Sequence, residues 1–341
     1  MAAKKKHGNV NSYLRGTCYV IAGMLVSFAG CSNQPTTKPN SSGGMSGKLR
    51  AVATVGMVAD LVRAIGGESV EVQQLMGSGV DPHLYRATRN DSLAIRDAEV
   101  VYYCGLKLEG KMSDLLGSGS AKRPAVAVAS GIPAERILRP DGTDHADPHV
   151  WMNVAMWSLA SESVAKSLCQ LRPEHATEYQ QRLSDLKKRL EALDAFGKQV
   201  IESIPKERRI LITSHDAFKY FGLQYGIEVA GIQGISTDSE AGLRRIRELV
   251  DMLVERKIDA VFVESSVPQD SVQALVRGAA DRGHAVRVAG PLYSDSMGES
   301  GTYEGTYVGM MDHNFSIIAS SLGGTVPEVP VPEARFDGTR Q

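Results

Sequence analysis

The chain has 341 residues, a formal net charge of −1 at pH 7, and 43% hydrophobic and 23% charged residues. One hydrophobic core rarely extends over so long a chain, so we expect two domains of ordinary globular composition. The balanced charge excludes a basic surface of the kind that binds nucleic acid, and the 6% aromatic content argues against stacking platforms for bases or sugars.

The first 30 residues have the pattern of an export signal. A basic start precedes the apolar run TCYVIAGMLVSFAG, whose length of about 14 residues is too short to span a membrane and suits a signal-peptide core. The run ends in FAGC, where small residues before a cysteine resemble the bacterial lipobox. We predict that residues 1–30 are removed and that Cys31 is lipidated. In the alternative, the signal is an ordinary cleavable one and Cys31 has no role.

Residues 31–48 are rich in Ser, Pro, Gly and Thr and contain almost no apolar side chains. Such a segment cannot bury enough apolar surface to offset the entropy lost on ordering, so we predict a flexible tether. A tether behind a lipid anchor would hold the folded part close to a membrane surface.

Short β-branched runs then alternate with helical patterns in two blocks. In the first block, strands are predicted over residues 49–55, 70–76, 98–105 and 124–130, with helices over 57–67 and 88–98. In the second block, strands are predicted over residues 208–214, 225–232, 258–266 and 284–290. Because strands separated by helices favour parallel sheets, we predict an α/β fold with two lobes, over residues 49–172 and 205–325, and a tail over 326–341.

Between the blocks, an amphipathic pattern predicts one long helix over residues 173–204. Its apolar residues recur at spacings of four and three, the period of a helix with one apolar stripe. The stripe consists of Tyr179, Leu183, Leu186, Leu190, Leu193 and Val200, with Gly197 in the remaining position. At about 1.5 Å per residue the helix is about 45 Å long, enough to pack on both lobes. A rigid helical connection permits less opening and closing than flexible crossover strands.

Four short stretches place potential metal ligands after strands or in tight turns. They are GVDPHLYRATRND with His83, DHADPHVWMN with His149, LITSHDAFKYF with His215, and the segment beginning GPLYSD with Asp295. Proline fixes its own backbone and biases the preceding aspartate to an extended conformation, so each DPH turn presents its histidine in a defined direction. Parallel sheets bind ligands at the carboxyl ends of their strands, so we expect two ligands from each lobe to meet in the interlobe cleft.

Three imidazoles and one carboxylate suit Zn²⁺ and can accept Mn²⁺ or another first-row divalent ion, whereas Ca²⁺ and Mg²⁺ favour oxygen ligands. A lone histidine near a strand end is more often a hydrogen-bonded structural residue, so the prediction depends on the recurrence of similar positions. We expect four further residues to lie beside the ligands and support them: Asp81, Asp147, His145 and Glu264.

The sequence contains no HExxH, GxSxG or Walker motif. A catalytic zinc ion keeps an open position for water, and four protein ligands would close its shell. We therefore favour a binding protein over the alternative of an extracytoplasmic zinc-dependent hydrolase, in which Glu264 would be the best candidate for the general base.

Together these stretches resemble the TroA-like zinc- and manganese-binding lipoproteins of metal ABC importers. The resemblance extends from about residue 50 to about residue 323 and covers DPHLY, DPHVWMN, SHDAFKYF, FVESS and LYSDSMGESGTYEGTYVGM. It implies two α/β lobes bridged by one long helix, capture of a divalent metal outside the cytoplasm, and delivery to a membrane permease driven by an ATPase. By residue match it implies the ligands His83, His149, His215 and Asp295. We expect a monomer that is not an enzyme.

Two details of the resemblance bear on the choice of metal. Manganese-dedicated members carry Glu where His215 stands, which favours zinc in this chain. Dedicated high-affinity zinc members carry a long His-rich loop before the second DPH, whereas residues 105–144 contain no histidine. We therefore expect broad use, with zinc bound tightly and manganese as a second candidate for the physiological cargo. Some members have been called adhesins, and a surface anchor would permit that alternative, although no residue pattern in this chain indicates it.

Overall fold

The computed structural model describes residues 47–117, 123–140, 145–238 and 240–327. The predicted export signal over residues 1–30, the predicted lipidation site Cys31 and all but the last two residues of the predicted tether lie outside this range. The described part belongs to one compact unit that begins at Gly47. None of the helices within it is both long enough and apolar enough to cross a membrane.

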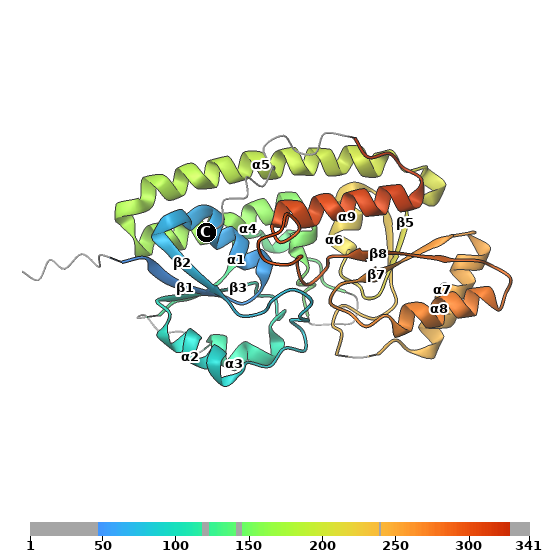
Figure 1. The fold of residues 1–341 in the computed structure, drawn as a ribbon, viewed down its shortest axis with the longest axis horizontal. Coiled ribbons are helices and arrows are strands. Elements are labelled where there is room, and N and C mark those ends of the chain that lie inside the picture. The colour runs from blue at the N-terminus through green and yellow to red at the C-terminus, as the bar shows by residue number, and fades with distance from the viewer. Residues whose placement is uncertain (1–46, 118–122, 141–144, 239, 328–341) are drawn as a thin grey trace, which may run out of the picture. The chain divides into compact units, whose positions relative to one another are not determined.

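The first sheet has four parallel strands in the order β2-β1-β3-β4 (Figure 1). They are β1 (Leu49–Ala53), β2 (Val70–Gln74), β3 (Val100–Tyr103) and β4 (Ala125–Ala127). The helices beside this sheet are α1 (Gly56–Gly66), α2 (Arg89–Asp97), α3 (Ser113–Gly117) and α4 (Val154–Leu171). In Figure 1, α1 and α4 lie above the strands and α2 and α3 below them, so the sheet is covered on both faces.

The second sheet repeats this plan with the strand order β6-β5-β7-β8, again all parallel. The strands are β5 (Ile210–Thr213), β6 (Glu228–Gly231), β7 (Ala260–Glu264) and β8 (Arg287–Leu292). The helices are α6 (Lys219–Tyr225), α7 (Leu243–Glu255), α8 (Asp270–Ala280) and α9 (Tyr307–Leu322). Every strand of both sheets lies within or overlaps a stretch predicted as a strand.

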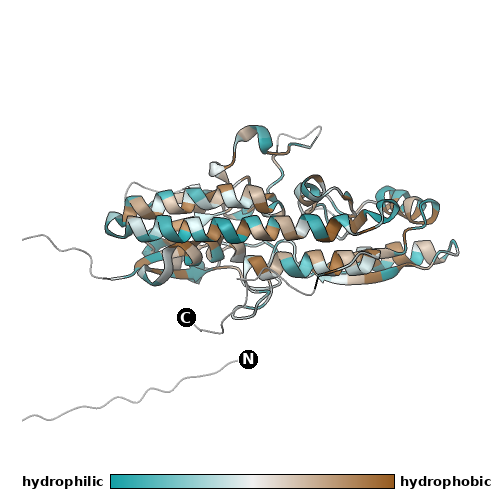
Figure 2. Ribbon diagram, turned by 90° about the horizontal axis from the view of Figure 1, so that it is seen from above, coloured by the Kyte–Doolittle hydropathy of each residue, from teal (hydrophilic) through white to brown (hydrophobic). Residues whose placement is uncertain are grey.

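One long helix, α5 (Ala176–Glu202, 27 residues), follows a 3-10 turn over Pro173–His175 and lies over both sheets in Figure 1. All residues of the predicted apolar stripe are buried, while the residues between them give α5 a polar outer face (Figure 2). The stripe belongs to a hydrophobic cluster that includes Val101 from the first sheet and Phe262 from the second. The predicted α/β fold, with two parallel sheets and one long helix, is therefore confirmed, and its two halves share a core.

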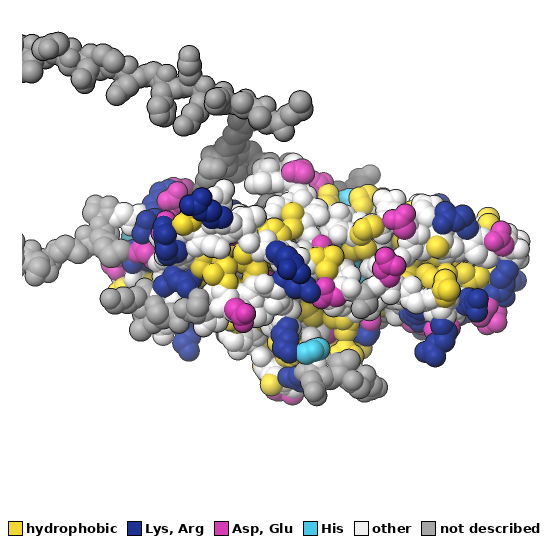
Figure 3. All heavy atoms as spheres, turned by 90° about the horizontal axis from the view of Figure 1, so that it is seen from below, with side chains coloured by type: hydrophobic (Ala, Val, Ile, Leu, Met, Phe, Trp, Pro, Cys, Tyr) yellow, Lys and Arg dark blue, Asp and Glu magenta, His cyan; other side chains and the backbone are white. Residues whose placement is uncertain are grey.

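The other face of the second sheet has its own hydrophobic cluster. Ile210, Ile212, Val261 and Val263 alternate along β5 and β7 with residues of the shared core and pack with Leu249 of α7 and other residues of α7 and α8. On the molecular face in Figure 3, basic and acidic side chains are interspersed, in keeping with the net charge of −1.

Gly197 lies where α5 approaches α9, and a Cβ atom at this position would clash with the buried ring of Phe315. Alanine favours a helix by about 1 kcal/mol, but extra volume in a filled core costs about 1–3 kcal/mol. We expect Gly197→Ala to lower the free energy of unfolding by up to about 2 kcal/mol, measured by chemical denaturation. Gly110→Ala is the control, because no atom lies within 4 Å of a Cβ there. A Gly197→Ala protein that is more stable than the wild type, as helix propensity alone would make it, would contradict the prediction.

Candidate metal centre

The four side chains predicted as ligands lie together. One potential ligand atom from each of His83, His149, His215 and Asp295 lies within 4.8 Å of the others, and this is the one such group in the part of the chain that the structure describes. The exposed fractions of these four residues are 5%, 0%, 0% and 1%, in the same order. The centre is therefore closed off from bulk solvent.

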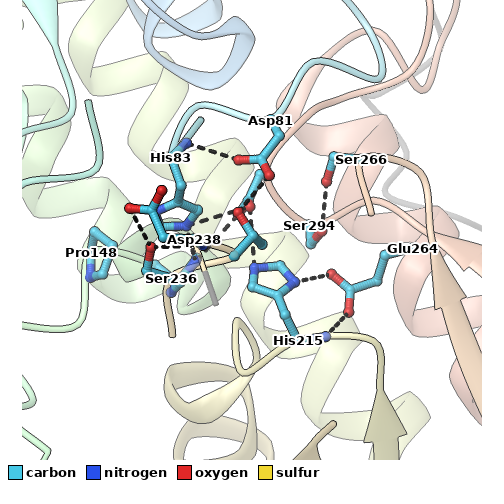
Figure 4. A network of polar contacts seen from close by, with 12 residues as sticks. Asp81, His83, Pro148, His215, Ser236, Asp238, Glu264, Ser266 and Ser294 are labelled. Carbon is cyan, nitrogen blue, oxygen red and sulfur yellow. Dashed lines mark hydrogen bonds and ion pairs between the residues drawn. The ribbon is translucent and has the colours of Figure 1, made fainter. Parts of the chain in front are cut away.

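Each lobe contributes two of these side chains. His83 and His149 come from loops of the first lobe, at the ends of the two DPH turns. His215 follows β5 by two residues and Asp295 follows β8 by three, so both lie at the carboxyl edge of the second sheet. Figure 4 shows His83 and His215 approaching from opposite sides.

The carboxylate of Asp295 faces all three imidazoles. Its oxygens lie 3.1 Å from Nε2 of His215, 3.3 Å from Nε2 of His149 and 3.6 Å from Nε2 of His83. The Nε2 atoms of His83 and His149 are 3.3 Å apart. Three nitrogens and one carboxylate thus converge on one small volume.

Two of the imidazoles are held from behind by carboxylates. Nδ1 of His149 lies 2.7 Å from Oδ1 of Asp147, and Nδ1 of His215 lies 2.6 Å from Oε2 of Glu264. The same carboxylates accept hydrogen bonds from the backbone N–H groups, at 3.0 Å for His149 and 2.8 Å for His215. Figure 4 shows both contacts between Glu264 and His215. A proton held on Nδ1 leaves the Nε2 lone pair free to face the centre.

The two DPH turns use their aspartates differently. In the second turn, one oxygen of Asp147 contacts both the backbone and the ring of His149. In the first, Oδ1 of Asp81 accepts from the backbone N–H of His83 at 2.8 Å, and Oδ2 accepts from the hydroxyl of Thr237 at 2.5 Å. Asp81 therefore fixes the backbone of His83 and connects it to the second lobe.

His145 has an exposed side chain whose Nδ1 lies 2.9 Å from Nζ of Lys107. This contact does not connect it to the ligands, in contrast to the contacts of Asp81, Asp147 and Glu264. Although His145 and His149 are four residues apart, they do not share one face of a helix, because Pro148 prevents a regular helix between them.

Burial and the neighbouring carboxylates shift the histidine pKa values in opposite directions. Burial disfavours the charged form of His149, but Asp147 and Asp295 outweigh it and raise the pKa of His149 to about 9. Burial likewise opposes protonation of His215, and Glu264 with Asp295 raises its pKa well above the usual range. The second lobe and the second DPH turn therefore hold two basic imidazoles.

The remaining two groups shift the other way. Burial dominates at His83 and lowers its pKa, with Asp295 acting against this effect. Burial alone would raise the pKa of Asp295, but the imidazoles of His215 and His149 hold it well below its usual range. Asp295 is therefore a carboxylate anion at any pH near neutrality.

The donor set fits a divalent cation. Both oxygens of Asp295 are buried and have no well-aligned hydrogen-bond donor among the described residues. With protons on Nδ1 of His149 and His215, the Nε2 lone pairs face those of the carboxylate, and they repel unless protons or a cation lie between them. Coordination of a metal ion by three nitrogens and one oxygen removes this conflict.

Polar links between the lobes surround the centre, and sequence patterns do not reveal them. The buried hydroxyl of Tyr220 in α6 accepts from the backbone N–H of Leu138 at 2.9 Å and donates to the carbonyl of Asp147 at 3.0 Å. Nε1 of Trp151 donates to the carbonyl of Ser294 at 2.9 Å. In the sequence alone, Tyr220 and Trp151 could equally be residues of the hydrophobic core, because Tyr and Trp carry a large apolar surface with one polar group.

A family model described as "Zinc-uptake complex component A periplasmic" matches residues 51–321. The chain belongs to this family. The manganese-binding lipoprotein MntA of Bacillus subtilis (strain 168) is similar in sequence to this chain. It is 45% identical over 275 residues, which cover 81% of this chain and 90% of MntA. The zinc-binding protein TroA of Treponema pallidum (strain Nichols) is 41% identical over 305 residues, which cover 89% of this chain and 97% of TroA.

The solved structure of the periplasmic zinc-binding protein TroA from Treponema pallidum matches with a TM-score of 0.79 at 44% identity. The match covers 81% of this chain and 99% of TroA. The predicted resemblance of this chain to the metal-binding lipoproteins of ABC importers is thus confirmed, together with the fold that it implied.

Proposed function

We propose that this protein binds one divalent transition-metal ion outside the cytoplasm and delivers it to the permease of an ABC importer. The proposed ligands are His83, His149, His215 and Asp295. The observation that carries the proposal is the convergence of three imidazole nitrogens on one buried carboxylate that lacks well-aligned hydrogen-bond donors. Membership of the zinc-uptake family supports the same reading.

The proposed cargo is Zn²⁺ or Mn²⁺. Sites with nitrogen ligands generally bind Zn²⁺ more tightly than Mn²⁺, so we propose tight zinc binding and weaker manganese binding. One similar relative is named for zinc and another for manganese, which supports a centre that accepts both. Metal analysis of the protein isolated from its own cells, followed by competition between the two ions, tests this proposal. Protein without stoichiometric metal that also fails to bind either ion on reconstitution would overturn it.

A binding role fits the centre better than hydrolysis. Four protein ligands fill a tetrahedral shell and leave no position for a reactive water. Both oxygens of Glu264 contact His215. We therefore propose that this carboxylate supports a ligand and does not act as a general base. Zinc-loaded protein can be assayed against esters, phosphates and peptides. Turnover that requires both zinc and Glu264 would favour the hydrolase.

We propose membrane attachment through Cys31, with the ATPase-driven permease as the partner and the protein acting as a monomer. Relatives named as lipoproteins support the anchor. The proposed organisation is an export signal (1–30), a tether (31–48), the first lobe (49–172), the linking helix (173–204), the second lobe (205–325) and a tail (326–341). Mass spectrometry of the mature N-terminus tests the anchor, since a lipid on residue 31 has a defined mass.

Glu264→Gln is expected to lower the zinc affinity about 10- to 100-fold. Glutamine offers one acceptor where two donors of His215, its backbone N–H and its Nδ1–H, now meet a carboxylate. The amide NH₂ then faces Nδ1 of His215. Nδ1 must accept this hydrogen bond, which favours the tautomer with the proton on Nε2 and removes the coordinating lone pair. Competition with a chromophoric chelator measures the affinity.

The matched control is Glu255→Gln, at an exposed position at the end of α7, which should bind zinc as the wild type does. Wild-type affinity in Glu264→Gln would mean that Glu264 does not set the tautomer of His215.

A further inference from the structure

The segment of the second lobe around Thr237 contacts the first lobe at two places. The hydroxyl of Thr237 donates to Oδ2 of Asp81 at 2.5 Å, and Oδ1 of Asp238 lies 3.0 Å from Nζ of Lys111. Figure 4 shows Asp81 and Asp238 in the polar network around His83. These contacts lie beside the first DPH turn.

The two contacts differ in strength. The side chains of Lys111 and Asp238 are 37% and 46% exposed, and ion pairs between such solvated groups contribute little. The hydrogen bond from Thr237 is half-buried and ends on a carboxylate, which makes it a charge-assisted bond. The other oxygen of that carboxylate already accepts from the backbone of His83. The bond from Thr237 therefore acts on a ligand-bearing turn.

His83 is the ligand whose position depends most on its turn. His149 and His215 have carboxylates within 2.7 Å of Nδ1, whereas Asp81 contacts only the backbone of His83. His83 also has the longest contact to Asp295, at 3.6 Å, and the largest exposed fraction of the four, 5%. Loosening of the first DPH turn would therefore free this imidazole before the others.

The remaining interface resists rigid opening. The links from Trp151 to Ser294 and from Tyr220 to Asp147 are buried, and one hydrophobic cluster includes residues of both sheets, α5 and α9. Separation of the lobes would expose this shared core, which is costly. We therefore expect the metal to leave through local displacement of the first DPH turn, to which Thr237 donates its hydrogen bond, and not through separation of the lobes.

We propose that Thr237 is a positioning residue for metal retention. Its hydroxyl, supplied by the second lobe, holds the carboxylate of Asp81 and through it the backbone of His83, so that the bond slows dissociation of the bound ion. The inference rests on the proposed metal-binding function. It adds to that function a residue whose hydrogen bond ends on the supporting carboxylate of Asp81.

The test is the rate at which zinc-loaded full-length protein loses its ion to excess EDTA. Thr237→Val keeps the shape and removes the hydroxyl, and we expect dissociation to become about tenfold faster. Thr237→Ala is a second variant without the branched side chain, and it should behave in the same way. Thr237→Ser retains the donor and should restore a rate close to that of the wild type.

Thr177→Val, at an exposed position in the first turn of α5, is the matched control with an expected wild-type rate. Thermal unfolding of the metal-free variants separates retention from stability, since a purely structural role would lower both. An unchanged rate in Thr237→Val and Thr237→Ala overturns the assignment, as does a Thr237→Ser protein that is as fast as Thr237→Val. Wild-type protein that retains no zinc would instead overturn the proposed function itself.

Discussion

Replacement of His215 by alanine is expected to weaken zinc binding by about 100- to 1000-fold. Zinc sites with four protein ligands have binding free energies of about 10–16 kcal/mol, so one ligand accounts for about 2.5–4 kcal/mol. His215 is fully buried, and its removal also leaves the carboxylate of Glu264 without its imidazole partner. Competition against a chelator of known zinc affinity measures the change.

Two further variants make the result interpretable. His215→Asn keeps part of the side-chain volume, so a loss of affinity in both variants reflects the ligand and not a cavity. His175→Ala is the control, because this half-buried histidine at the start of α5 contacts Glu178 and lies outside the ligand group. Wild-type affinity in His215→Ala would remove His215 from the site.

The zinc affinity is also expected to fall by about four orders of magnitude between pH 8 and pH 6. In the metal-free protein the pKa of His149 is raised to about 9 and that of His215 is raised well above its usual range, so both are protonated across this interval. A coordinated imidazole must be neutral, so binding displaces about two protons, and each contributes about tenfold per pH unit. His83, whose pKa is lowered, is already neutral and adds no step.

Calorimetry in two buffers with different ionisation enthalpies counts the protons released at pH 7. Asp147→Asn removes the carboxylate that most strongly raises the pKa of His149, so proton release should fall in this variant. An affinity that is constant from pH 6 to pH 8 would show that the two imidazoles are neutral before the metal binds.

The elements of the fold and the candidate ligands could be predicted from local patterns. Strands such as β7 (AVFVE) are buried on both faces, so they appear as unbroken apolar runs, and the stripe of α5 follows the helical period. The DPH turns restrict the backbone through proline, which makes His83 and His149 recognisable as presented side chains. These properties depend on neighbours in the chain, so the sequence by itself determined them.

The supporting contacts of the centre were decided only by tertiary structure. Asp81 and Asp147 stand in identical DPH turns, yet Asp147 reaches the ring of its histidine and Asp81 reaches Thr237, which is 156 residues away. His145, although close in sequence to the second turn, extends to the surface. The partner of each carboxylate depends on how the second lobe packs against the first through their shared core. No local pattern encodes that packing, because it brings together residues that are distant along the chain.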